Sequence, residues 1–341
     1  MTRQAVTFAV VMAFTAGLSF VSIGPAMSAG PVDIKITTVQ LRQQQMGVGI
    51  ERLAKYIDAQ LKGKVRVRTY PAAQLYSGRE ELEAVMKGDV QMAYVIGAVP
   101  EFVEPSFQLI KLPFLFPDID VSYKVLEGSV GKKIFSKLEA KGISVLGFVS
   151  SGTVGIHNSR HPIKNPDDFK GLKMRWSGPM GAATLKALGA ISTVSVPEEM
   201  YTAFQQGMID GGANPATVFY ARKLYDVQKY ITDAGMLNAV HVFLLGNGNW
   251  WNGLPPDIRS GVSEAIQQLV KEQRAEIEVE NKKLFEQIAA KGCQVLYLAP
   301  AEEAAWKKAV QPVYMEFTPQ IGTGLVDEAR QEVERLSKTK K

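Results

Sequence analysis

The feature that most constrains this sequence is a strand-then-helix pattern that occurs twice along the chain. Strand-like runs and helical stretches alternate at 33–39, 46–61, 65–70, 80–87 and 90–96. A further strand is expected at 143–148, and after Gly152 the pattern starts again, at 172–176, 179–188, 192–196 and from 197 onward. Strands that alternate with helices predict α/β layers built around a sheet.

The length of the chain indicates more than one such unit. It has 341 residues, which is more than one compact core usually holds, so two lobes are expected. A further strand is predicted at 240–245, a long amphipathic helix from Pro255 to about Ala290 and a last helix from about Ala301 to Leu336. Two α/β lobes with long closing helices predict a central cleft, which is where small ligands bind.

The N-terminal segment has the composition of an export signal. Arg3 is the only early charge, residues 5–23 are apolar or small, and a small-residue stretch follows Pro25. This order is typical of a secretory signal peptide, and we expect cleavage near Ser28. A membrane anchor is the alternative, but the span is weakly hydrophobic and is broken by Gly17 and Pro25. We therefore expect an exported, periplasmic protein.

Charge and cysteine content exclude some classes of function. The net charge is +5, from 39 Lys and Arg against 34 Asp and Glu, and it is spread too thinly for a nucleic-acid reader. The single cysteine, Cys293, is expected to be a small buried hydrophobe. His157 and His161 are expected in a solvated loop with no third metal ligand nearby, so we predict no metal and no cofactor.

Two polar positions are candidates for ligand contact. In the strand at 172–176, Arg175 is on the face opposite Met174 and close to the strand end, where its fork fits a carboxylate. An ordinary surface arginine is the alternative. Asn214 stands in a turn before Pro215, so its side chain either caps the next helix or faces a ligand.

Several segments, taken together and in order, resemble one family. They are YPAAQL at 70–75, LPFLF at 112–116, HPIKNPDDFKGLKMR at 161–175 and the block at 197–215 that ends in DGGANP. This set is similar to the solute-binding subunits of TRAP (tripartite ATP-independent periplasmic) transporters, of the DctP kind. The resemblance implies a bilobal binding protein with a long helix spanning both lobes. It also implies that the protein captures an organic acid and delivers it to two membrane subunits, which form a transporter driven by an ion gradient.

The resemblance also assigns residues and boundaries. Arg175 matches the family's carboxylate-binding arginine, Asn214 its cleft asparagine and Tyr94 a site-lining aromatic, and we add Gln40 and Trp176 as candidate ligand-binding residues. We expect a signal peptide at 1–28, lobe I at 29–151 with 240–279, and lobe II at 152–239 with 280–341. The protein is expected to be a monomer.

Three positions depart from relatives in the family. Many relatives have a second arginine where this chain has Val154. Sialic-acid-binding relatives have a carboxylate where it has Ile96 and an aromatic where it has Pro197. One arginine among apolar residues favours a monocarboxylate with an apolar or aromatic body, because an unpaired buried carboxylate is costly. A C4-dicarboxylate or a 2-oxo acid is the alternative ligand. Aromatic walls are expected from Trp176, Trp250, Phe219 or Tyr220, with core packing as the alternative for each.

Two other functions remain open. A periplasmic hydrolase or isomerase would need a base and a nucleophile that converge, and no such pattern is present in the sequence. A binding protein that reports to a sensor kinase would share the same cleft but have a different partner. We predict a binding protein rather than an enzyme.

Overall fold

The computed structural model describes residues 30–195 and 199–339, which form two sheets that share one strand. The first sheet has the order β2–β1–β3–β9–β4, with bounds Val65–Tyr70, Val32–Thr37, Met92–Ile96, Ala239–Asn247 and Ile143–Asn158. The second has the order β10–β8–β4–β7–β5–β6, with the further strands Gln294–Tyr297, Tyr230–Asp233, Gly211–Pro215, Lys173–Arg175 and Ile191–Thr193. The α/β fold class predicted from the alternating pattern is confirmed.

Strand β4 joins the two sheets. Its first part pairs with β9, and its last five residues pair with β7 on one side, four of them also with β8 on the other. The register of β4 shifts between Ser150 and Thr153, and Gly152 at this point has a φ of 94°. The lobe boundary predicted between residues 151 and 152 falls within this irregular stretch. The boundaries themselves stay a prediction.

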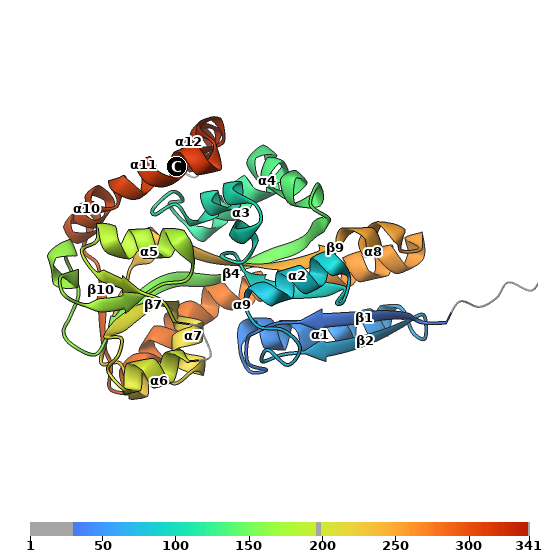
Figure 1. Cartoon of the computed structure of the whole chain (residues 1–341), viewed down its shortest axis with the longest axis horizontal. Helices are drawn as coiled ribbons and strands as arrows, with labels where there is room; N and C mark the ends of the chain where they lie inside the picture. The colour runs from blue at the N-terminus through green and yellow to red at the C-terminus, as the bar shows by residue number, and fades with distance from the viewer. Residues whose placement is uncertain (1–29, 196–198, 340–341) are drawn as a thin grey trace, which may run out of the picture.

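Helices cover both sheets (Figure 1). They are α1 (Gln45–Gln60), α2 (Arg79–Lys87), α3 (Ile119–Glu127), α4 (Ser129–Glu139), α5 (Gly178–Ala187), α6 (Met200–Gln205), α7 (Ala216–Ala221), α8 (Gly248–Gly253), α9 (Pro256–Ala290), α10 (Pro300–Ala309), α11 (Gln311–Ile321) and α12 (Thr323–Lys338). Short 3-10 turns include η1 (Pro100–Phe102) and η2 (Pro105–Lys111), and others lie at Pro166–Phe169, Leu224–Asp226 and Gly235–Leu237.

The long helix α9 contacts both sheets. It has 35 residues and packs against α1 and β4 near one end and against α7 and β10 near the other (Figure 1). Pro256 occupies its first turn, where the missing proline N–H costs no hydrogen bond. The predicted helix from Pro255 to about Ala290 is therefore confirmed. No helix in the described residues is long and apolar enough to cross a membrane.

Three details of the predicted secondary structure were wrong. The last helix is three helices, because Pro312 lies in the first turn of α11 and separates it from α10, and Gly322, with a φ of 104°, separates α11 from α12. His157 lies in β4 rather than in a loop. Asn214 lies in β7 rather than in a turn, so it does not cap a helix. The glycines before Asn214 allow close strand packing, since a Cβ on Gly211 would lie 2.0 Å from the His157 carbonyl oxygen.

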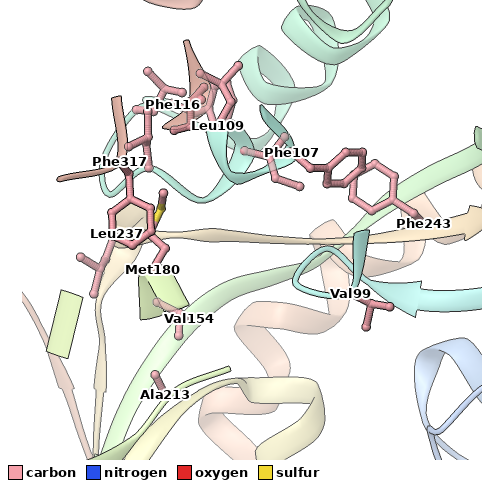
Figure 2. Packing of buried hydrophobic residues seen from close by; sticks show 14 of the residues in the cluster. Val99, Phe107, Leu109, Phe116, Val154, Met180, Ala213, Leu237, Phe243 and Phe317 are labelled. Atoms are coloured by element: carbon pink, nitrogen blue, oxygen red, sulfur yellow. The ribbon is translucent and has the colours of Figure 1, made fainter. Parts of the chain in front are cut away.

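The main hydrophobic core runs continuously beneath both sheets. Figure 2 shows its buried side chains, among them the Phe107 and Phe243 rings, whose centroids are 4.8 Å apart in an edge arrangement. A second core lies between β1, α1 and α9, and a third between α6, α7 and the end of α9. Cys293 is buried and packs in the third core, as the sequence predicted.

Candidate functional site

A cavity of about 100 Å³ opens where strands of both sheets end. It is lined by Val39 and Gln40 after β1, by residues 96–98 at the end of β3, by Arg175 and Trp176 at the end of β5, and by Asn214 near the end of β7. Ligands of α/β sheets bind outside the carboxyl ends of the strands, where neighbouring strands diverge. The two sheets thus place polar side chains from distant parts of the sequence around one space.

Arg175 is a buried cation of this cavity, with a relative exposure of 4%. Its Nη2 donates to Ser177 Oγ at 3.2 Å and to the Ser195 carbonyl oxygen at 3.1 Å. Its Nη1 contacts Met200 Sδ at 3.6 Å, and a thioether is a weak acceptor. A ligand carboxylate is a much stronger partner for this guanidinium than the sulfur atom.

Asn214 is held by a histidine behind it. His157 Nε2 lies 3.0 Å from Asn214 Oδ1, and His157 Nδ1 lies 2.9 Å from Gln228 Oε1. Burial lowers the pKa of His157 to about 4, and the nearby Arg175 charge also lowers it, so the imidazole is neutral at pH 7. A neutral imidazole has a single N–H and donates to only one of these two amide oxygens, and the Asn214 side-chain amide lines the cavity as well as contacting His157.

Two glutamines line the side of the cavity near β1 and α1. Gln40 is buried, and its Oε1 accepts from the Met46 backbone N–H at 2.9 Å. Gln44, which the sequence did not single out, uses Oε1 to accept from the Leu41 N–H. Its Nε2 is buried without a hydrogen-bond partner in the part of the chain described. A buried donor in this state is costly unless a ligand oxygen satisfies it.

The apolar part of the lining comes from several elements. Ile96 and Trp176 both line the cavity, and the Trp176 indole packs over Gly181 of α5, where a Cβ would lie 2.7 Å from its Cγ. The other aromatic candidates, Phe219, Tyr220 and Trp250, lie outside the lining. Phe219 and Trp250 pack in the third and second cores.

Two predicted site positions of the described residues, Tyr94 and Val154, are not part of this lining. Tyr94 is buried and its hydroxyl donates to Gln273 Oε1 at 2.7 Å. Val154 is buried in the main core, where Figure 2 shows it among the other apolar side chains. Pro197 lies outside the described residues.

Sequence reasoning missed two further cations beside Arg175. Arg222, at the end of α7, and Lys111, at the end of η2, both line the cavity. Lys111 forms a buried ion pair with Glu101, with Nζ 3.1 Å from Oε1. The sequence spacing does not predict this ion pair, because its two residues are ten positions apart and lie in two separate short turns. His241 also lines the cavity, and it is neutral at pH 7 because burial lowers its pKa to about 4.

Metal chemistry is not suggested by this arrangement. No group of three histidine, cysteine or acidic residues in the described ranges converges as metal ligands would. His157 is buried between aromatic rings, and His161 is exposed on the surface. The expectation that His157 is a solvated loop histidine was wrong, because β4 continues to Asn158.

The fold and the cavity together define a two-lobe α/β binding protein for a small molecule. The chain belongs to the bacterial extracellular solute-binding protein family 7, the DctP family, whose model matches residues 37–320. It is 35% identical to the C4-dicarboxylate-binding periplasmic protein DctP of Rhodobacter capsulatus over 303 residues, which are 87% of this chain and 90% of that protein.

Two solved structures show the same fold. A TRAP periplasmic solute-binding protein from Sulfurospirillum deleyianum with bound succinate has a TM-score of 0.82 and 30% identity, covering 89% of this chain and 99% of that one. One from Ralstonia eutropha H16 with bound (S)-2-acetolactate has a TM-score of 0.84, 30% identity and the same coverage. The chain is thus a solute-binding transport protein of a periplasmic family rather than an enzyme, as predicted.

Proposed function

We propose that this chain is the periplasmic subunit of a TRAP transporter that captures a C4-dicarboxylate through Arg175 and delivers it to the membrane subunits. The observation that carries the proposal is a second arginine, Arg222, that lines the same cavity as Arg175. Arginine is the side chain best suited to bind carboxylates, because its planar fork donates two parallel hydrogen bonds.

Capture begins at the Arg175 guanidinium. A carboxylate that replaces the weak Met200 sulfur contact gains charge-assisted hydrogen bonds in a buried setting. The Asn214 side-chain amide forms a hydrogen bond with the same end of the ligand. Gln44 Nε2, from the α1 side, donates to an oxygen that reaches across the cavity. Because these donors come from both sheets, a bound acid favours closure of the lobes around it.

The second carboxylate decides between the two ligand classes considered from the sequence. A monocarboxylate with an apolar body was favoured because Val154 replaces an arginine of many relatives, and that preference is not confirmed. Arg222 provides a guanidinium at a different position of the cavity lining. The relatives support this choice, since the Rhodobacter protein is named for C4-dicarboxylates and the Sulfurospirillum structure holds succinate.

The test compares two acids with the same carbon chain. Calorimetry on residues 29–341 should show succinate binding at least a hundredfold more tightly than butyrate, which lacks the second carboxylate. Arg222→Gln should weaken succinate binding and leave butyrate binding less affected. Equal affinity for the two acids would contradict the proposal and support the monocarboxylate hypothesis.

Three expectations about the whole protein are part of this proposal. The signal peptide is removed near Ser28, which lies outside the described residues, and mass spectrometry of the exported protein tests it. The mature protein is a monomer, which light scattering tests. The lobes divide near residues 151, 239 and 279, where the irregular stretch of β4 supports the first boundary.

A further inference from the structure

His157 is a completely buried histidine that stands directly behind a residue of the cavity lining. Its two ring nitrogens face two side-chain amides, those of Asn214 at 3.0 Å and Gln228 at 2.9 Å. Asn214 lines the cavity, whereas His157 does not. The histidine therefore does not touch a ligand in the cavity, but it holds a side chain that faces one.

The pairing of β4 with β7 brings these two side chains together. Gly155 is opposite Asn214 and Gly212 is opposite His157, so the two polar residues are diagonal neighbours on one face of the sheet. The two glycines keep the space between them free of other side chains. A Cβ at Gly212 would lie 2.8 Å from the Arg175 carbonyl oxygen and 3.3 Å from its Cγ, so a larger residue there would also displace Arg175.

The imidazole is fixed on its other sides. The rings of Phe204 and Phe219 pack against it, with centroids 5.3 and 5.0 Å away. Gln228, which is 1% exposed, faces Nδ1 and is itself held, because its Nε2 donates to the Asp210 carbonyl oxygen at 3.3 Å. The imidazole is thus a rigid support, built from buried parts of the second sheet and the helices beside it.

This support fixes the rotation of the Asn214 amide. A neutral imidazole has one donor and one acceptor on opposite sides of the ring, and an amide has one of each at its two corners. When one corner of the Asn214 amide is bound to His157, the other corner is directed away from the ring. A side chain that is held in this way before the ligand arrives loses less conformational freedom on binding.

We infer that His157 is a positioning residue for solute binding, which holds the Asn214 amide in the rotation that the bound ligand requires. Leaving one such side chain to be ordered only on binding weakens the affinity by about two- to tenfold. The inference rests on the proposed contact between Asn214 and the ligand, and it gives this buried histidine an effect on affinity without any contact of its own.

A double-mutant cycle on succinate affinity tests whether His157 acts through Asn214. His157→Phe keeps an aromatic ring in the same place but cannot hydrogen-bond. In calorimetry on residues 29–341 it should weaken succinate binding about three- to tenfold. In a protein that already has Asn214→Leu, which is similar in volume and has no amide, the same change should alter the affinity by less than about twofold. A merely structural role would weaken binding by the same factor in both proteins, and this result would overturn the inference.

Thr232→Val is the matched control for the loss of a buried hydrogen bond in this sheet. Thr232 is 1% exposed on β8, which also pairs with β4, and its hydroxyl donates to the Ile163 carbonyl oxygen at 2.6 Å. Because Thr232 does not line the cavity, the variant should lower the free energy of unfolding and keep succinate affinity within about twofold of the wild type. Weakening as large as that of His157→Phe would show a general effect of the sheet and contradict the inference.

A measurement on the wild type decides the question even if His157→Phe does not fold. Nitrogen-15 NMR reports the hydrogen bonds of the histidine rings, and saturating succinate should shift the His157 resonances because its partner amide then also bonds the ligand. The exposed His161 is the internal reference and should not shift. Unchanged His157 resonances would overturn the inference. Unchanged succinate affinity in Asn214→Leu would instead refute the contact of Asn214 with the ligand, and absence of succinate binding to the wild type would refute the proposed function itself.

Discussion

Replacing Arg175 by glutamine should cost about 3–5 kcal/mol of ligand-binding free energy, because the ligand's carboxylate would then be buried without its cation. Arg175 is only 4% exposed, so water cannot take over the lost hydrogen bonds. The dissociation constant for succinate should accordingly rise between about a hundredfold and a few thousandfold.

The same change should leave the fold largely intact. Among the contacts of the Arg175 guanidinium are hydrogen bonds to two uncharged groups, Ser177 Oγ and the Ser195 carbonyl, and a contact with the Met200 sulfur. Each such hydrogen bond contributes about 1 kcal/mol to stability, and a glutamine amide replaces part of this. Titration calorimetry then measures binding, and thermal unfolding without ligand checks that the variant is folded.

Lys173→Gln is the matched control for this experiment. Lys173 lies two residues earlier on β5, carries the same charge and is exposed to solvent. The Lys173→Gln variant should bind succinate like the wild type, because the effect of a distant, solvent-exposed charge is screened. Affinity of Arg175→Gln within threefold of the wild type, with the control behaving normally, would refute the assigned role of Arg175.

Three further outcomes test other parts of the structure. Gly178→Ala should lower the free energy of unfolding by about 2 kcal/mol or more in chemical denaturation. Residue 178 has a positive φ, and the added Cβ would lie 2.0 Å from Glu101 Oε1. An unchanged midpoint would contradict this. The pKa of both His157 and His241 is about 4 in the folded protein, and unfolded histidine titrates near 6.5, so only the unfolded state gains protons as pH falls from 7 to 5. Each histidine should therefore lower the free energy of unfolding by about 2 kcal/mol between pH 7 and pH 5. If a variant with glutamine in place of one histidine keeps the full pH dependence, that histidine makes no such contribution. Burial raises the pKa of the Cys293 thiol to about 11, so a disulfide reagent should label it slowly in the native protein and rapidly in denaturant, and equal rates would show that it is accessible.

The fold was largely predictable because its strands and helices have strong periodic signals. Strand-then-helix alternation identified the first sheet, and the Pro-Pro start with an apolar face identified α9. The last segment was misjudged as one helix because its apolar spacing continues across α10 to α12. Gly322 at a positive φ breaks it, and such a glycine has no periodic signature.

The candidate site was predictable only in part. Arg175 and Asn214 stand at strand ends, in segments that resemble a known family. Neither His157 nor Asn214 was expected in a strand. A central strand is buried on both faces and is usually an apolar run, whereas both residues are polar, and the Gly-Gly pair before Asn214 resembles a turn.

The unpredicted groups of the cavity depend on long-range placement. Lys111 and Glu101 lie in short 3-10 turns, and they approach Arg175 only through the loop at Ser177. Gln44 reaches the cavity because β1 ends there and the chain turns into α1. Arg222 ends a six-residue helix whose sequence gives no sign of facing a cavity. Contacts of this kind follow from the tertiary fold rather than from local spacing.

A crystal structure of the mature protein grown with succinate tests the central claim most directly. One ligand carboxylate is expected within hydrogen-bond distance of the Arg175 guanidinium and the Asn214 amide, with the Met200 sulfur contact replaced. A succinate bound elsewhere, with Arg175 still in contact with Met200, would contradict the claim that this arginine captures the ligand.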